Sequence, residues 1–437
     1  MKSPSPEDNV ESRMRDEWNH RAREDAHYYV AFGRRDQDDE EFFATAAGLV
    51  SELASELKRL PETRRALEIG CGPGRLLRPM SRCFDEVHGV DVSDAMIALA
   101  KEKLRDVPNA VPHAIGGSDL KLFPDAHFDF VYSYAVFQHI PSAEVVFSYL
   151  SETVRVLRPG GVARLQINGL PKSSEAYTTG VYTTWEGVRI GADEIHTFTR
   201  EHGMELLALT GIDSQYMWTT WRKPETSPPL PASACRIRAV SNAFSSEQAV
   251  PATGRLACLA ASVGNLPAGC DLNSLTVYID GLPGRVSYIG PREKNGFSQV
   301  NVFLPKGVRT GLLPLRLEWR GEILADGSNS RYVRVIPPGP AVPRLNALTD
   351  AVNLMSPTRI ESGLIKASIE EVDAIEGFRA TVDDTPVEKI ETFRADPLTE
   401  RWEVNFEVPH SVEAGGRVLE IRLGTRILAR MGIEVVR

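Results

Sequence analysis

A glycine-rich turn between a buried strand and a helix constrains the fold of this chain more than any other feature. Residues 65–69 form a short apolar run, and the turn that follows places Gly70, Gly72 and Gly74 at alternate positions. Glycine tolerates positive φ angles and lets a ligand approach the main chain closely. A strand that leads through such a turn into a helix is typical of an open α/β sheet, with the ligand at the carboxyl ends of the strands.

Short apolar runs alternate with amphipathic patterns over the first half of the chain. The runs are short enough for buried strands and the patterns have helical spacing. They lie at 65–69, 87–91, 128–133 and 162–167 for the strands, and at 95–104 and 145–157 for the helices. This alternation predicts a doubly wound parallel sheet with helices on both faces. Residues 206–209 and 216–221 indicate a further pair of strands.

Proline-rich stretches at 223–231 and 337–343 divide the chain, because prolines at this density exclude helix interiors and central strands. Beyond the first stretch, alternating runs separated by Gly, Pro, Asn and Asp predict all-β sandwiches. The two β-rich segments also match each other at an offset of 104 residues, so that 300–301 recurs at 404–405. A repeat at one spacing predicts a duplicated domain.

The expected organisation therefore has four segments. They are an N-terminal helical lid over 1–60, an α/β domain over 61–223, an Ig-like β-sandwich over 232–336 and its repeat over 344–437.

Composition and charge narrow the classes of partner. The net charge of −9 disfavours a nucleic-acid binder, because an acidic surface repels phosphate backbones. We expect no membrane span, since no apolar run approaches 18 residues, and no signal peptide in the polar N-terminal sequence. The five cysteines lack metal-ligand spacing, so we expect no metal. We expect reduced thiols and therefore a reducing, cytoplasmic location, and the alternative is a pair between Cys258 and Cys270 across a hairpin.

Two acidic residues distinguish this glycine turn from the turn of a dinucleotide-binding site. Glu68 precedes the turn, where it would repel a pyrophosphate but suits a cationic ligand with an amino group. Asp91 ends the next expected strand, where a carboxylate can accept both hydroxyls of a ribose. Arg75 and Leu77 occupy the positions where a dinucleotide loop would have its last glycine. The alternative for both acids is a solvated strand end.

Through these residues the chain resembles class I S-adenosylmethionine-dependent methyltransferases, especially those that act on small molecules. The resemblance continues at 91–96, 123–133 and 156–161. It implies a Rossmann-like sheet, S-adenosyl-L-methionine as cofactor, and methyl transfer to an O or N of a small-molecule acceptor. The cofactor-binding residues that it implies are Glu68, Gly70, Cys71, Gly72, Gly74, Asp91, Val92, Met96, Ser118, Asp119, Ser133 and Tyr134.

Several of these residues have a second interpretation. Many relatives have an acidic residue followed by a small residue after the third strand, whereas here the small Ser118 comes first and the acidic Asp119 second. Either Ser118 or Asp119 could therefore bind the adenine amine. Cys71 is a small residue tolerated beside the cofactor or a reactive thiol. Met96 either covers the adenine or packs within its helix.

The acceptor is expected just beyond the fourth strand. His139 is the candidate general base there, and the alternative is a histidine that caps or packs in the loop. Tyr28, Tyr29 and Trp185 are candidates for the substrate pocket together with His139. No fixed catalytic residue is required, because alignment alone supplies about 7–11 kcal/mol in favourable cases.

The sandwiches leave two alternative functions open. In one, the enzyme modifies a protein or glycan that the Ig-like domains hold. In the other, the first domain binds cofactor without turnover and the chain is an interaction scaffold. The intact glycine turn and Asp91 argue against the scaffold. Dimerisation through the sandwiches also remains open, because a fold by itself implies no function.

Overall fold

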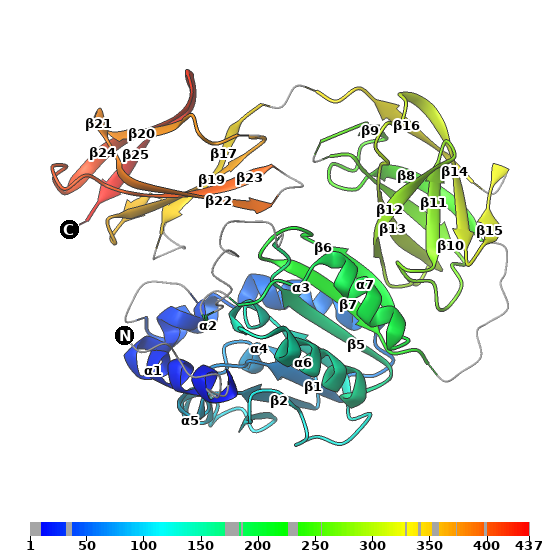
Figure 1. Cartoon of the computed structure of the whole chain (residues 1–437), viewed down its shortest axis with the longest axis horizontal. Coiled ribbons are helices and arrows are strands. Elements are labelled where there is room, and N and C mark those ends of the chain that lie inside the picture. Colours follow the sequence, from blue (N-terminus) through cyan, green and yellow to red (C-terminus); the bar gives the residue numbers. More distant parts are fainter. Residues whose placement is uncertain are drawn as a thin grey trace. The chain divides into compact units, whose positions relative to one another are not determined.

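A computed structural model describes most of the chain. The described residues are 10–31, 37–170, 183–184, 187–225, 235–254, 256–327, 330–339, 342–351, 358–372, 374–396 and 400–436. They divide into two compact units (Figure 1). One unit holds Met1–Ala26 and Phe43–Pro338, and the other holds His27–Phe42 and Gly339–Arg437. None of the described helices is both long and apolar enough to cross a membrane.

The first unit begins with a mixed α/β sheet. Five strands run parallel in the order β3-β2-β1-β4-β5, and an antiparallel pair extends the sheet through β7 to β6. The strands are β1 (Arg65–Ile69), β2 (Glu86–Asp91), β3 (Ala110–Ala114), β4 (Phe128–Ser133), β5 (Leu157–Ile167), β6 (Glu205–Thr210) and β7 (Met217–Arg222). The expected strands and the terminal strand pair are confirmed.

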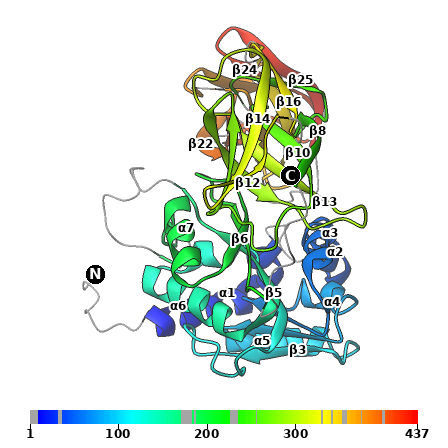
Figure 2. The same ribbon diagram turned by 90° about the vertical axis from the view of Figure 1, so that its right-hand side faces the viewer.

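Helices cover both faces of this sheet, because its central strands are apolar on both sides. Alternate residues of β1 show the division: Ala66 packs into one core and Leu67 into the other. Figure 2 shows α3 on one side of the sheet and α6 and α7 on the other. The helices beside Ala66 are α3 (Ala47–Glu56), α4 (Leu77–Met80) and α5 (Asp94–Lys103), and those beside Leu67 are α6 (Ala143–Val156) and α7 (Ala192–Glu201).

The remaining helical elements precede the sheet or follow one of its strands. They are α1 (Val10–Ala31), α2 (Asp39–Ala44), η1 (Leu57–Arg59) and η2 (Phe137–His139). The backbone of α1 is non-helical at Asp25, which divides the helix in two. Of the segment predicted as a lid over 1–60, Met1–Ala26 and the residues from Phe43 on belong to the first unit and His27–Phe42 to the second. The lid stays a prediction.

An all-β sandwich follows within the first unit. One group of strands is ordered β8-β10-β13-β12, and a second is ordered β12-β11-β14-β16-β9 with β15 paired to β14. The strands are β8 (Arg236–Asn242), β9 (Ala249–Pro251), β10 (Cys258–Gly264), β11 (Leu275–Ile279), β12 (Leu282–Ile289), β13 (Phe297–Phe303), β14 (Gly311–Trp319), β15 (Glu322–Ala325) and β16 (Tyr332–Ile336).

This first sandwich is joined to the edge of the α/β sheet by main-chain pairing. Tyr288 on β12 pairs with Ala208 on β6. Close by, the carbonyl of Leu206 accepts from the Leu272 N–H at 2.7 Å, and the Leu206 N–H donates to Asp271 Oδ2 at 3.2 Å. The edge strand β6 is therefore covered rather than left open to another chain.

The second unit contains the other sandwich. Its two sheets are ordered β17-β19-β23-β22 and β18-β25-β24-β20-β21. The strands are β17 (Arg344–Asp350), β18 (Arg359–Ile360), β19 (Leu364–Glu370), β20 (Phe378–Val382), β21 (Thr385–Pro386), β22 (Glu388–Asp396), β23 (Arg401–Glu407), β24 (Gly415–Leu423) and β25 (Arg426–Val435).

The two sandwiches share strand bounds and register. Strand β13 spans 297–303 and β23 spans 401–407, an offset of 104, and β14 and β24 have the same offset. Val300 and Val302 are fully buried on β13, as are Val404 and Phe406 on β23. The neighbours also correspond, since β13 pairs with β10 as β23 pairs with β19.

Candidate active site

The glycine turn after β1 folds back onto the end of β2. The N–H groups of Gly70 and Cys71 both donate to the carbonyl of Val90, at 2.8 and 3.0 Å. Gly70 has φ +73°, and a Cβ at this position would lie 2.2 Å from Val136 Cγ2. Gly74 has φ +90°, and a Cβ there would lie 2.8 Å from Leu104 Cδ1. The turn therefore requires glycine for its backbone conformation and because neighbouring side chains leave no space for a Cβ.

Asp91 connects this turn to the start of α5. Its Oδ2 accepts from the Gly72 N–H at 2.9 Å and its Oδ1 accepts from the Ser93 N–H at 2.8 Å. Burial raises the pKa of Asp91 from 3.8 to about 6. Each carboxylate oxygen can accept more than one hydrogen bond, so both retain capacity for ligand hydroxyls.

Glu68 lies deeper than its position in the sequence implies. Its side chain is buried and accepts a hydrogen bond from Tyr132 Oη at 3.2 Å. Burial raises the pKa of Glu68, while the Tyr132 hydrogen bond and the positive charge of Arg75 lower it. The carboxylate is therefore part of a buried polar group beneath the turn, and its role toward a cofactor remains a proposal.

The other residues around the turn are held by local contacts. Cys71 is buried, and burial raises the pKa of its thiol, which opposes thiolate reactivity. The Ser133 hydroxyl donates to the carbonyl of Ile69 at 2.8 Å, which ties β4 to β1. The Tyr134 ring stacks on the Trp218 ring, with centroids 5.8 Å apart. The Arg75 guanidinium lies over the Tyr134 ring, 5.7 Å from its centroid, in a cation–π contact.

The first part of α1 lies over the carboxyl ends of β2 and β3. Asn19 Oδ1 accepts from the Ser93 hydroxyl at 2.8 Å and from the Ala95 N–H at 3.0 Å. Arg15 donates to the carbonyl of Gly116 at 3.0 Å. Asn19 and Arg15 were not identified from the sequence, because nothing in the local pattern of a polar helix marks partners about 75 to 100 positions away.

The loop after β3 holds the two residues proposed to bind the adenine amine. The carbonyl of Ser118 accepts from the Ser148 hydroxyl at 2.7 Å. Asp119 forms an ion pair with Lys121 at 2.6 Å, and this hydrogen-bonded pair lowers the pKa of Asp119. At the facing end of β2, Val92 approaches Gly117, and Met96 in α5 is buried with its N–H bonded to Ser93 Oγ.

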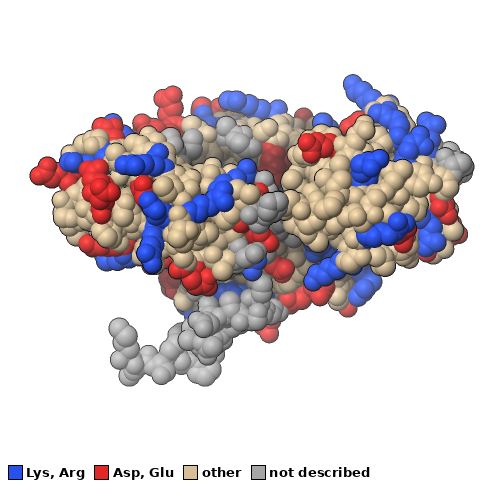
Figure 3. Space-filling view, turned by 90° about the horizontal axis from the view of Figure 1, so that it is seen from above, with Lys and Arg blue, Asp and Glu red and all other residues tan. Residues whose placement is uncertain are grey.

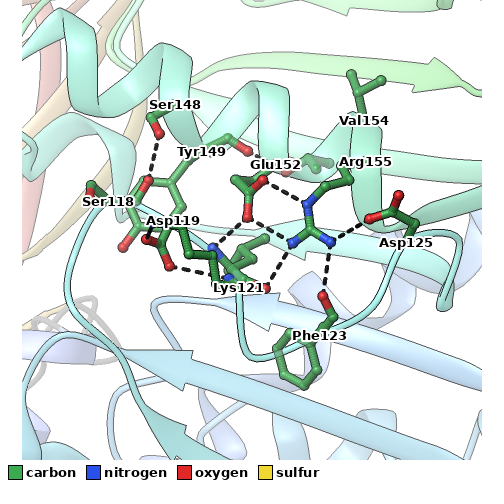
Figure 4. A network of polar contacts seen from close by, with 12 residues as sticks. Ser118, Asp119, Lys121, Phe123, Asp125, Ser148, Tyr149, Glu152, Val154 and Arg155 are labelled. Carbon is green, nitrogen blue, oxygen red and sulfur yellow. Dashed lines mark hydrogen bonds and ion pairs between the residues drawn. The ribbon is translucent and has the colours of Figure 1, made fainter.

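Two residues of α6, Arg155 and Glu152, hold this loop by hydrogen bonds to its main chain (Figure 4). Arg155 donates to the carbonyls of Leu120 and Phe123, at 3.0 and 2.9 Å. Glu152 accepts from the Leu120 N–H at 2.8 Å and also pairs with Arg155. Arg155 and Glu152 therefore position the loop without lying in it, and the sequence analysis did not identify them.

His139 lies in η2, just after β4. It is buried, and the Trp18 ring of α1 meets it edge-on with centroids 5.3 Å apart. Gln138 Nε2 lies 3.3 Å from His139 Nε2. Gln166 on β5 binds Gln138 in turn, donating to Gln138 Oε1 at 3.1 Å.

Gln166 is anchored by main-chain groups at both ends of its amide. Its Oε1 accepts from the Ala135 N–H at 2.7 Å, and its Nε2 also donates to the carbonyl of Gln215 at 2.7 Å. Because Gln166 Oε1 is an acceptor of a main-chain N–H, its Nε2 is the donor toward Gln138, and Gln138 Oε1 must accept. The Gln138 amide nitrogen therefore faces His139 as a donor. His139 Nε2 is then the acceptor, and the neutral ring carries its proton on Nδ1.

The other residues proposed for the substrate pocket are Tyr28, Tyr29 and Trp185. Tyr28 and Tyr29 belong to the second unit, where their rings pack edge-to-face with centroids 5.2 Å apart. Trp185 lies outside the described residues. The adjacent Thr184 is fully buried, receives a hydrogen bond from Arg21 at 3.0 Å and bonds Glu17, so α1 also contacts the segment between β5 and α7.

These residues fit an adenosine-containing cofactor. The glycine turn has no side chain at Gly70, Gly72 or Gly74, and Asp91 presents carboxylate oxygens at the end of the adjacent strand. The parallel order β3-β2-β1-β4-β5 with antiparallel β7 inserted beside β5 defines a class I methyltransferase sheet. Residues 67–165 match the family described as methyltransferase domain. The chain therefore carries a class I S-adenosylmethionine-dependent methyltransferase domain.

Two curated relatives and one solved structure illustrate the similarity. Phosphoethanolamine N-methyltransferase 2 of Caenorhabditis elegans is 35% identical over 105 residues, which are 24% of this chain and 23% of that protein. Ubiquinone biosynthesis O-methyltransferase of Maricaulis maris is 27% identical over 35% of this chain and 63% of that protein. A structure of geranyl diphosphate C-methyltransferase from Streptomyces coelicolor is 13% identical, with a TM-score of 0.35, over 50% of this chain and all of that one. The chain thus spans less than two thirds of both curated relatives.

Proposed function

We propose that this protein transfers a methyl group from S-adenosyl-L-methionine to an O or N of a small-molecule acceptor by in-line displacement. The observation that carries the proposal is the pairing of Asp91 with the glycine turn, through the hydrogen bond from Gly72 to Asp91 Oδ2. The family match over 67–165 supports it. The two curated relatives act on nitrogen in one case and on oxygen in the other, so both acceptor atoms remain in the proposal.

Each residue near the turn has a proposed task. Asp91 accepts the ribose hydroxyls, and Gly70, Gly72 and Gly74 let the cofactor approach the main chain. Val92 and Met96 flank the adenine, and Ser118 or Asp119 receives its amine. Glu68 acts beneath the turn, on the side of the cofactor's amino group, and Cys71, Ser133 and Tyr134 border the same site.

The chain's contribution to the chemistry is alignment and exclusion of water. When bound, the cofactor supplies an activated methyl group together with its own leaving group. The contacts of α1 with Ser93 and His139 support a role for this helix in enclosing the site. For an acceptor that must lose a proton, His139 is the proposed general base, with Gln138 and Gln166 setting its tautomer.

Calorimetry tests the assignment directly. Titration with S-adenosylhomocysteine should give saturable heat, whereas NAD should give none, because Glu68 and Arg75 replace the features of a dinucleotide loop. Heat from NAD and none from S-adenosylhomocysteine would overturn the proposal. A metabolite library screened with labelled cofactor then identifies the acceptor.

A second candidate is a methyltransferase whose protein or glycan acceptor is held by the Ig-like domains. The observation that favours it is the main-chain pairing of Tyr288 with Ala208, which makes the first sandwich continuous with the enzyme's sheet. Comparing residues 1–223, which lack both sandwiches, with the full chain, on small and on polymeric acceptors, separates the two candidates. A cytoplasmic location is also proposed, and the five free thiols support it.

A further inference from the structure

A groove on the first sandwich is lined by arginines and exposed apolar side chains. Its volume is about 750 Å³, and it is lined on one side by β8 and on the other by the neighbouring strands β14, β16 and β9 with the segment that precedes β9. Its main side chains are Arg238, Arg331, Arg334, Leu312, Tyr332 and Glu247. Leu312 is 55% exposed and Tyr332 is 59% exposed, so neither contributes to the core.

The three arginines have no carboxylate partner among the described residues. Arg331 donates to the carbonyls of Arg238 and Ser330, and Arg238 lies over the Phe297 ring at 4.6 Å. Elsewhere on the same sandwich, Arg309 is paired with Asp280. Figure 3 shows basic side chains among uncharged surface on this sandwich, at the right of the view. In a chain of net charge −9, such a site is suited to an anionic ligand.

The duplicated sandwich shows that the fold does not require these residues. Gly311 pairs with Val335 in the first sandwich, and Gly415 pairs with Val435 in the second, so the registers correspond. By that register, the positions of Leu312 and Arg334 are occupied in the second sandwich by Gly416 and Glu434. Tyr332 corresponds in the same way to Gly432. The same strands therefore form without an arginine, a leucine or a tyrosine at these positions.

The geometry also argues against capture of a peptide as an added strand. Two edge strands border the groove: β8, whose one partner among the described strands is β10, and β9, which pairs with β16 and is three residues long, too short to template a further strand. Arg331 Nε already donates to the Arg238 carbonyl on β8, and the β8–β10 register shifts between Ser262 and Val263. Occupied carbonyls and bulges are features that protect edges against strand addition. Recognition at this groove must therefore be made by side chains.

We propose that this groove binds an acidic oligosaccharide whose sugar rings carry carboxylates. Arg331 and Arg334 are placed to pair with carboxylates, because the planar guanidinium matches them with two donors. Tyr332 and Leu312 offer apolar surfaces to the C–H faces of the rings. The site is separate from the glycine turn and does not depend on the proposed methyl transfer.

The test is calorimetry of the full chain with a galacturonic acid hexamer as probe. Binding should be saturable and should weaken as salt is raised, whereas a neutral maltohexaose should give no heat. The variant Leu312→Gly/Arg334→Glu should lose at least tenfold in affinity. It should fold, because those residues occupy the matching positions of the second sandwich. Arg379→Ala, at an exposed position on β20, is the matched control and should bind as the parent does.

Three results would overturn the proposal. They are no heat from the hexamer, unchanged affinity in the double variant, and tighter binding of a polyglutamate peptide than of the hexamer, which would identify a protein ligand. Titration of the same variant with S-adenosylhomocysteine reports on the methyltransferase domain separately. Failure of one site is thereby distinguished from failure of the other.

Discussion

Gln138 Nε2 lies 3.3 Å from His139 Nε2, and Gln166 holds the Gln138 amide in the orientation that makes it the donor. The ring nitrogen that a general base would use therefore already accepts a hydrogen bond. If His139 is the general base that we propose, its Nε2 has to give up the hydrogen bond from Gln138 before it can accept a proton from the methyl acceptor.

This relationship makes His139→Ala informative. If the ring is the base, kcat should fall about a hundredfold or more, in the range that general-base catalysis supplies, and should recover in part at high pH. Gln138→Ala is the control, because it frees Nε2 without removing the ring, and it should lower kcat much less. A loss below tenfold in His139→Ala that does not vary with pH would assign the ring to packing against Trp18.

Asp91→Asn should weaken binding of S-adenosylhomocysteine by about 1.5–3 kcal/mol, as expected when a hydrogen bond to a charged group is lost. Asp94→Asn, at the exposed start of α5, is the matched control and should leave affinity unchanged. Calorimetry checks both. Equal affinities for Asp91→Asn and the parent would remove Asp91 from the cofactor site.

The raised pKa of Asp91 predicts that the stability of the fold and the affinity for cofactor change in opposite directions with pH. Its pKa in the folded chain is about 6, against 3.8 ordinarily, so the folded state binds this proton more tightly than the unfolded state does. Its contribution to stability is present at low pH and is lost as the pH rises through about 6. Cofactor affinity should rise over the same range, because ribose hydroxyls donate to the ionised carboxylate. Denaturation and calorimetry of Asp91→Asn should show both dependences reduced, and a parent that shows neither contradicts the prediction.

Gly70→Ala should destabilise the first unit by about 2–5 kcal/mol, the sum of a left-handed backbone cost and overpacking. The new Cβ would lie 2.2 Å from Val136 Cγ2 at a φ of +73°. Gly203→Ala is the control, since Gly203 has φ +63° but nothing within 4 Å, and it should cost only about 1–2 kcal/mol. Urea denaturation measures both, and equal costs would show that Val136 moves aside freely.

Asp271→Ala should weaken the joint between the first sandwich and β6. It leaves the buried Leu206 N–H without its acceptor, which costs about 1–3 kcal/mol. Asp280→Ala, which breaks only the exposed pair with Arg309, should cost at most about 1 kcal/mol. By the same reasoning, residues 1–338 should fold and bind S-adenosylhomocysteine with a higher melting temperature than residues 1–223. A fragment 1–223 as stable as 1–338 would show that the joint contributes nothing.

Local spacing accounts for what the sequence predicted about this fold. Apolar runs of strand length, the alternation with helices and the Gly70–Gly74 turn each depend on residues within a few positions of one another. The offset of 104 that relates 297–303 to 401–407 is likewise visible without coordinates. Asp91 was predicted at the site for the same reason, because it ends a strand that neighbours the turn in a doubly wound sheet.

The amino-acid sequence by itself thus determined the class of sheet, the glycine turn, the strand-ending carboxylate and the duplication. Only the tertiary structure decided that Asn19 binds Ser93, that Gln166 orients Gln138, and that Leu206 on β6 is covered by the first sandwich. Asn19 and Ser93 are 74 positions apart, and Leu206 and Asp271 are 65 apart. Periodicity reports which face of an element is buried, but not which distant side chain meets it, because that choice is made when packed elements satisfy their buried polar groups.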